Sequence, residues 1–476
     1  MSPRTEPTAG VTRRRRTREA ADRGTDRTGT EFEVEVGTIA HGGHCVARHD
    51  GRVVFVRHAL PGERVLVRVT EGSDGSAFWR ADAVRVLQAD ADRVEAACPV
   101  AGPGRCGGCD FQHVTPARQR ALKADVVAEQ LHRLAGLDVD VVVEAVPEPI
   151  TARTSRQVVR QVEGGSAPGA APEGLRWRTR TQFAVDAEGR TGLRKHRSHD
   201  VIPVADCPIS TEEVLASGVL DARFGNVEAV EVATGSDGAP PLVVITPTAG
   251  RKANLPRLPD ASLAIRTPDG VHRVSGRTWV GERIRVRGRD FAFRVGGAGF
   301  WQVHSGAAPA LAEAVLEALQ PQPGERAVDL YAGAGLFTAV LADAVGERGS
   351  VLAVESDERA VRDARRSLHG QAQVELWAGR VEEALEDPDL LDPAVGGAVD
   401  VVVLDPPRAG AGAVAVAGIA ALAPRVVAYV ACDPAALARD VAFFAGHGYV
   451  LDGLRAFDLF PMTHHVECVA RLVPRP

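Results

Sequence analysis

Short hydrophobic runs that each end at a reactive side chain mark the C-terminal part of the chain. The run 401–404 stops at Asp405 and the run 426–431 stops at Cys432, with a proline close behind each. Apolar, β-branched runs of this length are typical of parallel strands buried on both faces. Neighbouring strands of an open α/β sheet present such residues side by side at the carboxyl edge, where ligands bind. The pattern therefore predicts one crevice that contains a carboxylate and a candidate nucleophile.

Residues 298–476 also show the alternation of strand, turn and helix expected of an α/β domain. A predicted strand at 327–331 runs into a glycine turn at 332–336, and glycines let a ligand approach the backbone closely. The next predicted strand, 351–355, ends in Glu355, which is placed to accept hydrogen bonds from ribose hydroxyls; a surface carboxylate is the alternative. Because the turn lacks the third glycine of the dinucleotide fingerprint, it favours S-adenosylmethionine over NAD.

The N-terminal half has the other periodicity, with apolar and polar positions alternating in short runs between glycine-rich turns. Residues 31–90 are therefore predicted as a small five-stranded barrel of the OB type, a fold that often binds oligonucleotides; a protein-binding module is the alternative. Residues 91–297 are expected to form a β-rich central domain, with a helix at 118–137. The low-complexity stretch 151–174 is predicted as an insertion loop, and residues 1–30 as a disordered basic tail.

Composition limits the class of protein but does not identify its binding partner. The chain has 476 residues, 45% of them hydrophobic and 25% charged, which is typical of a soluble protein with several domains. Its formal net charge of -6 does not indicate a nucleic-acid partner, but basic side chains gather between residues 176 and 197. No apolar run is long enough to span a membrane, and the polar N-terminus does not resemble a secretory signal. We expect a cytoplasmic monomer that contacts no membrane.

Three of the seven cysteines crowd into one glycine- and proline-rich segment, at Cys98, Cys106 and Cys109. A backbone of that composition can wrap tightly and aim three thiolates at one point, and in a cytosolic chain such crowding favours a metal or catalytic role over disulfides. Zinc and iron–sulfur clusters usually take four ligands, so a fourth is needed: Cys207 is the best candidate and His113 the alternative. Spacing alone does not distinguish zinc from an iron–sulfur cluster.

Five motifs in the C-terminal part resemble those of the RNA uridine carbon-5 methyltransferases. They are Phe300-Trp-Gln-Val, Asp329-Leu-Tyr-Ala-Gly-Ala-Gly, Leu404-Asp-Pro-Pro-Arg-Ala-Gly, Tyr429-Val-Ala-Cys432-Asp-Pro and Phe460-Pro-Met-Thr-His-His-Val-Glu467. In the predicted barrel, Gly37-Thr-Ile-Ala-His-Gly-Gly followed by Leu60-Pro-Gly-Glu resembles the TRAM domain of RNA-modifying enzymes. The cysteine run is similar to that of the family's iron–sulfur branch, although the gap between its first two cysteines is longer. The chain also departs from the family at Ala431, usually Ser, and at Asp433, usually Asn.

The resemblance implies a fold and a reaction. The fold is α/β: a TRAM barrel, a β-rich middle domain with the cluster cysteines and a Rossmann-like class I methyltransferase domain. The reaction methylates carbon 5 of a specific uridine in rRNA or tRNA, with rRNA the favoured substrate. Uracil carbon 5 is not nucleophilic enough to take a methyl group directly, but a thiolate adding to carbon 6 creates an enolate that is. The resemblance assigns this thiolate to Cys432 and the later removal of the carbon 5 proton to Glu467.

Further site residues follow from the same resemblance. The implied contacts of S-adenosylmethionine are Gln302, Tyr331, Glu355 and Asp405, with Asp405 open between the cofactor and the flipped uracil. The implied ligands of a [4Fe-4S] cluster, favoured over zinc, are Cys98, Cys106, Cys109 and Cys207, and the cluster is expected to have a structural or RNA-positioning role. A free cysteine has a pKa of about 8.5, so the site is expected to favour the thiolate of the nucleophile. Glu467 is expected on an edge strand.

Two other functions compete with this interpretation. A methyltransferase that acts on a base amino group needs no cysteine, but such enzymes often carry Asp-Pro-Pro-Tyr where this chain has Arg408 in the fourth position. A non-catalytic RNA-binding protein built on a decayed methyltransferase domain has no reason to keep both Cys432 and Glu467. The residues therefore favour the carbon-5 reaction.

Overall fold

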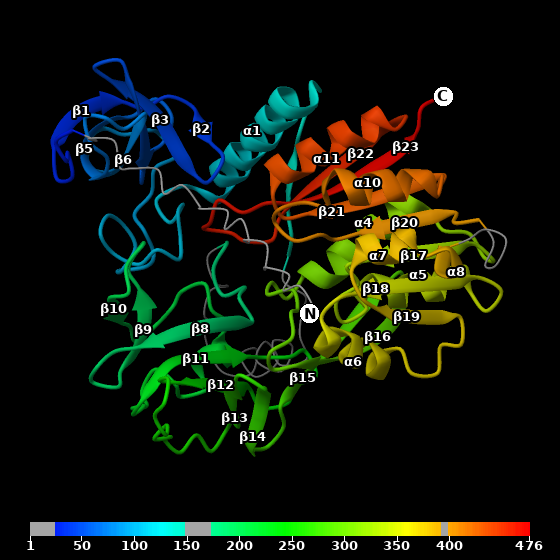
Figure 1. Cartoon of the computed structure of the whole chain (residues 1–476). Helices are drawn as coiled ribbons and strands as arrows, with labels where there is room; N and C mark the ends of the chain where they lie inside the picture. Colours follow the sequence, from blue (N-terminus) through cyan, green and yellow to red (C-terminus); the bar gives the residue numbers. More distant parts are fainter. Residues whose placement is uncertain (1–23, 148–172, 392–397) are drawn as a thin grey trace, which may run out of the picture.

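The computed structural model describes residues 24–147, 173–391 and 398–476. They form three bodies: a small barrel drawn in blue, a green central sheet, and a sheet covered by helices that runs from yellow to red (Figure 1). The predicted tail up to residue 23 and all but the last two residues of the predicted insertion loop lie outside these ranges. None of the helices within the described ranges is long and apolar enough to cross a membrane.

The N-terminal barrel contains six strands in the order β1-β5-β6-β4-β3-β2, all antiparallel to their neighbours except β4 and β6. The strands are β1 (Glu31–Glu35), β2 (Ile39–Ala40), β3 (His44–His49), β4 (Arg52–Arg57), β5 (Arg64–Glu71) and β6 (Phe78–Gln88). The buried positions of β5 alternate with exposed ones, as the sequence pattern predicts. The predicted count of five strands is wrong because β2, only two residues long, pairs with β3 across a tight glycine turn.

Residues 24–30 correct the predicted disordered tail. The backbone N–H of Arg27 donates to the carbonyl of Gly72 at 3.0 Å, and that of Gly29 donates to the carbonyl of Val69 at 2.8 Å. The end of β5 and the turn after it thus offer main-chain partners to this segment. A prediction from composition does not consider such partners, because they come from a distant part of the chain.

Helix α1 (Pro116–Ala135) confirms the helix predicted at 118–137 and touches two bodies at once. It begins with a proline, which suits a first helical turn, and it ends at Gly136 in the left-handed conformation, with φ 67°. Leu122 packs into the core of the barrel, whereas Val127 packs into a core of the C-terminal body. The helix, cyan in Figure 1, therefore joins the barrel to the C-terminal sheet.

The central body is a seven-stranded sheet in the order β10-β9-β8-β11-β12-β13-β14, with a separate β15–β16 hairpin, which confirms the predicted β-rich middle region. Its elements are β8 (Arg180–Val185), β9 (Thr191–Arg194), β10 (Val201–Pro203), α3 (Glu212–Leu215), β11 (Val227–Ala233), β12 (Leu242–Pro247), β13 (Ser262–Thr267), β14 (Gly270–Ser275), β15 (Trp279–Val286) and β16 (Arg289–Gly296). Only β12 and β13 are parallel neighbours.

The C-terminal sheet has eight strands in the order β19-β18-β17-β20-β21-β23-β22-β7. Its elements are β7 (Val143–Ala145), α4 (Ala307–Leu319), β17 (Arg326–Leu330), α5 (Leu336–Val345), β18 (Ser350–Glu355), α6 (Glu358–Ser367), β19 (Val374–Ala378), α7 (Val381–Glu386), α8 (Pro388–Leu391), β20 (Val401–Leu404), α10 (Gly412–Ala421), β21 (Val426–Ala431), α11 (Pro434–Gly446), β22 (Tyr449–Asp458) and β23 (Glu467–Pro474). Strands β17 to β21 are parallel, β23 is antiparallel to both of its neighbours, and β7 joins β22 from far earlier in the chain.

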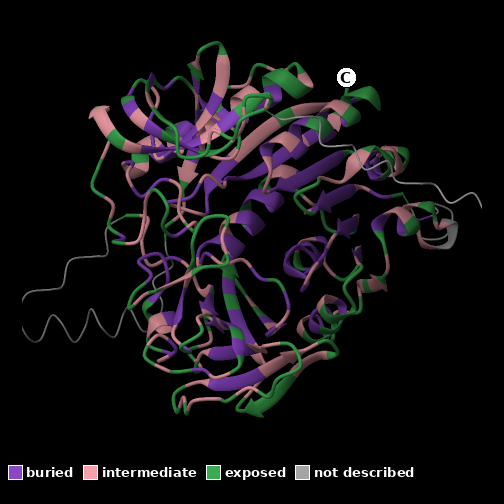
Figure 2. Cartoon of the chain, turned by 60° about the vertical axis from the view of Figure 1, so that its left-hand side comes forward, coloured by how far each residue is buried: buried purple, intermediate pink, exposed green. Residues whose placement is uncertain are grey.

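Two hydrophobic cores cover opposite faces of this sheet, which explains the uninterrupted apolar run of β20. Val401 and Val403 face the core that contains α4 and α5, whereas Val402 and Leu404 face the core that contains α10 and α11. The strands accordingly appear buried in Figure 2. The strand order reverses between β17 and β20, and a ligand crevice is expected at the carboxyl ends of the strands there.

Candidate active site

Cys432 and Glu467 lie opposite each other at the end of two paired strands. Ala431, the last residue of β21, pairs with Cys468 of the antiparallel β23, so the next pair in the same register is Cys432 and Glu467. Glu467 is only 5% exposed. The prediction that Glu467 lies on an edge strand is wrong, because β23 inserts between β21 and β22 and buries the carboxylate.

Asp405 joins this pair from the neighbouring strand. It follows β20, which is parallel to β21, and its backbone N–H donates to the carbonyl of Leu330 at 3.2 Å. The charge of Asp405 raises the pKa of both Cys432 and Glu467, and the charge of Arg408 lowers both. Two carboxylates, one thiol and one guanidinium therefore share the crevice that the sequence predicts at the carboxyl edge.

Burial raises the pKa of all three acidic groups. It raises the pKa of Asp405 to about 7, and it raises the pKa of Glu467 well above its ordinary value, with the charge of Asp405 adding to the effect. The pKa of Cys432 is raised to about 12, by burial first and then by the charges of Glu467 and Asp405. The expectation that the site favours the thiolate is therefore wrong for the free protein, because two carboxylates oppose a third negative charge beside them.

The glycine turn after β17 is shaped to admit a ligand. Gly333 and Gly335 have φ of 57° and 91°, which side chains rarely adopt, and no atom lies within 4 Å of the place where a Cβ on Gly333 would stand. The carboxylate of Glu355 accepts the N–H of Gly333 at 2.9 Å and that of Asp357 at 2.7 Å. Glu355 therefore fastens the turn to the start of α6 and is not a free surface carboxylate.

Two further side chains, Asp329 and Tyr331, immediately precede this turn in the sequence, and the predicted cofactor contact Gln302 lies earlier in the chain. Asp329 is fully buried and accepts the hydroxyl of Thr338 at 2.6 Å with one oxygen, while the other oxygen has no partner among the described residues. Tyr331 has φ 65°, a strained conformation for a non-glycine residue, and burial raises its pKa to about 12. Gln302 is half-buried between β16 and α4, and the hydrogen bonds described around it do not involve its side chain.

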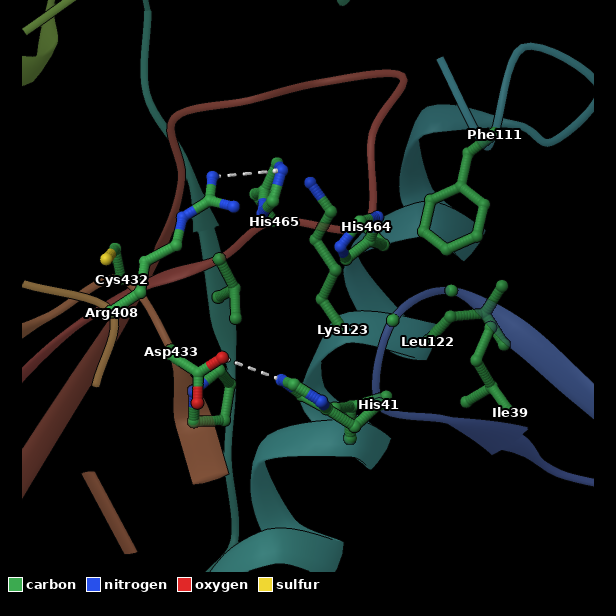
Figure 3. A pocket seen from close by; sticks show the side chains of 15 residues that line it. Ile39, His41, Phe111, Leu122, Lys123, Arg408, Cys432, Asp433, His464 and His465 are labelled. Atoms are coloured by element: carbon green, nitrogen blue, oxygen red, sulfur yellow. Dashed lines mark hydrogen bonds and ion pairs between the residues drawn. The ribbon is translucent and has the colours of Figure 1, made fainter. Parts of the chain in front are cut away.

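A pocket opens beside Cys432 where the barrel, α1 and the loop before Glu467 meet (Figure 3). The barrel contributes the turn from Ile39 to Gly43, and α1 contributes Leu122 and Lys123. Figure 3 shows Arg408 near Cys432, with His464 and His465 on the loop that closes the pocket. Cys432 thus lines a space that three distant parts of the chain build together.

Sequence analysis missed His41 of this pocket. Its Nε2 lies 3.0 Å from Oδ2 of Asp433, whose Oδ1 accepts the N–H of Ala436 at 2.8 Å and so caps α11. The hydrogen bond from Asp433 raises the pKa of His41. The signal for this contact in the sequence was Asp433, which stands where the family usually has Asn. A carboxylate at this position can cap the helix and also bind a cationic side chain such as His41.

Lys123 was missed as well. It is buried, with Nζ 2.5 Å from Oδ1 of Asp458 and 3.1 Å from the carbonyl of Phe460. Burial lowers its pKa in spite of the nearby Asp458 charge. A lysine on the inner face of an amphipathic helix was the signal, because a buried charge needs a partner.

The four predicted cysteine ligands are near enough for their charges to act on one another. Cys98, Cys106 and Cys207 are buried, and the pKa of Cys109 is raised by burial and then by the charges of these three. His113, the alternative ligand, packs edge-to-face on His58. Within the described ranges, however, no set of three or more His, Cys, Asp or Glu side chains is arranged to hold a metal ion. A metal centre here stays a prediction.

Comparison with known proteins identifies the domains around this site. Residues 26–81 match the TRAM domain, and residues 265–474 match the family described as tRNA (Uracil-5-)-methyltransferase. An uncharacterized RNA methyltransferase of Streptomyces avermitilis is 49% identical and covers 94% of this chain and 99% of its own length. The 23S rRNA (uracil(1939)-C(5))-methyltransferase RlmD of Alkalilimnicola ehrlichii is 32% identical over 92% of this chain and 96% of its own.

A solved structure shares the fold. It is the Pyrococcus abyssi tRNA (uracil-54, C5)-methyltransferase in complex with S-adenosyl-L-homocysteine, with a TM-score of 0.65, 21% identity, and coverage of 93% of this chain and 100% of that one. The strand order and the glycine turn thus define a methyltransferase fold preceded by a TRAM barrel. The chain belongs to the RNA (uracil-C5) methyltransferase family, as its motifs indicated; its place in the iron–sulfur branch stays a prediction.

Proposed function

We propose that this protein methylates carbon 5 of a uridine in RNA, using S-adenosylmethionine and a transient covalent bond between Cys432 and uracil. The observation that carries the proposal is the register at the sheet edge, which sets Cys432 opposite Glu467. A nucleophile and a base at the end of one strand pair can act on two adjacent ring atoms, carbon 6 and carbon 5.

Cys432 acts first. The thiol releases its proton to solvent, its sulfur bonds to carbon 6, and the electrons of the carbon 5–carbon 6 double bond shift into an enolate whose carbon 5 is nucleophilic. The raised pKa keeps this thiol protonated in the free protein, so attack awaits the substrate. Arg408 lowers the pKa of Cys432 and thus favours the thiolate as it forms. The uridine must leave its base stack to reach this buried edge.

Glu467 acts last. Its carboxylate takes the proton from the methylated carbon 5, and the sulfur leaves carbon 6 as the ring double bond re-forms. Because burial and the Asp405 charge raise the pKa of Glu467, its carboxylate is a stronger base than an exposed glutamate. In sum, one proton leaves the ring, one methyl group enters, and Cys432 is regenerated.

The residues around the glycine turn fit S-adenosylmethionine, which supplies the methyl group when it is bound. The open space beside Gly333 leaves room for a ligand, and one oxygen of the buried Asp329, two residues before Tyr331, has no partner among the described residues. Glu355 lies at the end of β18, where its remaining lone pairs can accept ribose hydroxyls. The cofactor contacts that we propose are Gln302, Tyr331, Glu355 and Asp405.

The RNA is rRNA in this proposal. Support comes from the relative in A. ehrlichii, which is named for 23S rRNA and matches over nearly the whole chain. The P. abyssi enzyme, which is named for tRNA, supports the fold alone at 21% identity. Both RNA classes belong in the test.

We also propose that the four cysteines hold a [4Fe-4S] cluster in preference to zinc. Support comes from the burial of Cys98, Cys106 and Cys207 and from the charges of these three residues, each of which raises the pKa of Cys109. A cluster would tie Cys207 of the central body to the segment that carries Cys98, Cys106 and Cys109. Iron and acid-labile sulfide, measured in protein purified without oxygen, should be present in equal amounts; zinc in their place would contradict the cluster.

The decisive experiment uses methyl-labelled S-adenosylmethionine. Wild-type protein and Cys432→Ala are incubated with rRNA and with tRNA, and the nucleosides are analysed by mass spectrometry. Labelled 5-methyluridine from rRNA with the wild type alone is the expected result. Label on another base, or equal label with both proteins, would contradict the cysteine mechanism, and label on tRNA alone would reassign the substrate.

A further inference from the structure

Asp110 joins three parts of the molecule directly after Cys109. Its Oδ1 lies 3.4 Å from the guanidinium of Arg57, a buried residue of β4. Its Oδ2 lies 2.6 Å from Nδ1 of His464 and accepts the backbone N–H of His464 at 3.3 Å. His464 stands in the loop before Glu467. One carboxylate therefore connects the barrel, the cysteine segment and the loop that leads to the proposed base.

The main chain makes the same connection. The N–H groups of Asp110 and Phe111 both donate to the carbonyl of Met462 at 2.9 Å, and the N–H of Met462 donates to Gln119 of α1 at 2.8 Å. Met462 has φ 66°, a conformation that a non-glycine residue keeps only with outside support. The shape of the loop 460–466 is thus set by two distant segments, one at Asp110 and Phe111 and one at Gln119, which lies 343 residues before Met462.

The loop 460–466 also contacts Arg408 and leads directly into Glu467, so its position affects residues of the proposed reaction. The rings of His464 and His465 are 4.1 Å apart, and Nε2 of His465 lies 3.5 Å from the guanidinium of Arg408 (Figure 3). On its other side, the loop packs tightly against the barrel, because a Cβ on Gly43 would stand 2.6 Å from Cβ of His464. Glu467 begins β23 only three residues after His464, so a shift of the loop turns its side chain.

We propose that Asp110 is a positioning residue that fixes the loop 460–466 and thereby orients Glu467 for removal of the carbon 5 proton. This role rests on the function proposed above. Both carboxylate oxygens are needed, since one faces Arg57 and the other faces His464. An asparagine of the same shape accepts on only one side, because its amide nitrogen cannot accept the backbone N–H of His464 or a guanidinium N–H of Arg57.

The test compares turnover with the amount of covalent protein–RNA complex. If removal of the carbon 5 proton is slow, the sulfur stays bonded to carbon 6 and the complex survives denaturing electrophoresis. We expect Asp110→Asn and His464→Ala to lower kcat about tenfold or more, as small misplacements of catalytic groups do, and to accumulate the complex with little change in KM for RNA. Glu467→Gln is the positive control.

His132→Ala is the matched control, because His132 makes the same kind of contact with Asp138, at 2.7 Å, on the exposed end of α1. It should behave as the wild type does. Lower kcat without accumulation of the complex in the Asp110 and His464 variants would overturn the positioning role, since general damage slows every step alike. If Asp110→Asn does not fold, His464→Ala carries the test, because the side chain of His464 is 29% exposed.

Amide hydrogen exchange of the loop 460–466 gives a readout that needs no reaction. Exchange should be faster in both variants than in the wild type and unchanged in His132→Ala; equal exchange in all would overturn the inference. Absence of 5-methyluridine with the wild type, and of complex with Glu467→Gln, would instead contradict the proposed function. The exchange data would then still decide whether Asp110 fixes the loop.

Discussion

The chain builds two groups of buried and half-buried side chains in opposite ways. The strand-end group is Asp405, Cys432 and Glu467, and the cysteine group is Cys98, Cys106, Cys109 and Cys207. The strand-end group stands on strands whose register is set by main-chain hydrogen bonds. Three members of the cysteine group lie between β6 and α1 on a segment with no named helix or strand, held by turns such as the N–H of Cys106 donating to Val100 at 3.0 Å.

This difference predicts that the strand-end group matters mainly for the reaction and the cysteine group mainly for stability. Strand ends keep their geometry whatever side chain they carry, because the ladder does not depend on it. A loop-built group has no such ladder, so its thiols, or the group that they hold, contribute to the shape of the segment itself. Changes in the strand-end group should therefore affect the reaction, and changes in the cysteine group should affect folding.

The largest expected effect is on methyl transfer. Cys432→Ala should lower the rate by about 10⁴-fold or more, because no other group can supply the covalent step, while the melting temperature stays close to that of the wild type. Cys106→Ser should do the reverse, with a lower melting temperature and a smaller loss of rate. Both quantities are measured on the same preparations. If Cys106→Ser kept full activity and the wild-type melting temperature, the structural role of the cysteine group would be wrong.

A smaller but still large effect concerns the buried ion pair between Lys123 of α1 and Asp458 of β22. Lys123→Met removes one partner of the buried pair with Asp458 and should cost about 3–5 kcal/mol of unfolding free energy, since an uncompensated buried carboxylate remains. Denaturant titration measures this cost. The double variant Lys123→Met with Asp458→Leu is the control and should recover most of the loss. A cost below about 1 kcal/mol in the single variant would show that the pair is not charged.

The charges of the strand-end group should also affect the reactivity of the Cys432 thiol. Below its pKa of about 12, the thiolate fraction of Cys432 rises tenfold per pH unit, so alkylation should increase up to pH 10 without a plateau. Glu467→Gln removes a negative charge and should speed alkylation at a given pH; Arg408→Ala should slow it. Mass spectrometry of the Cys432 peptide follows each rate. A plateau near neutral pH would mean that the thiolate is favoured after all.

The smallest effect belongs to the contact between His41 and Asp433. Removing this half-exposed pair with His41→Ala should cost less than about 1 kcal/mol. Because the folded pKa of His41 is raised, its contribution is complete below the unfolded value of about 6.5 and is lost as the pH rises through the folded value. Melting temperatures of the variant and the wild type should therefore differ at pH 5.5 and converge at pH 9. A difference that grows with pH would contradict this ion pair.

Local pattern predicted four strands of the C-terminal sheet, β17, β18, β20 and β21, to within one residue. This worked for β20 and β21 because burial on both faces leaves an uninterrupted apolar run, and a proline marks its end. It failed for the surroundings of Glu467, because β23 inserts between β21 and the earlier strand β22, an inversion of chain order that no local pattern reports. The domain boundaries at 90 and 297 stay predictions. Strand β7 lies within the predicted central domain in the sequence, but it joins the C-terminal sheet by pairing with β22.

By itself, the sequence determined the reactive side chains, the glycine turn and the strands that carry them, because these depend on periodicity and on the conformations that neighbouring residues allow. Only the tertiary structure decided the raised pKa of Cys432, the contact of His41 with Asp433 and the junction at Asp110. Each of these depends on which distant segments exclude water and bring their charges together. The residues proposed for the reaction can therefore be predicted from the sequence, but the electrostatics around them arise only on folding.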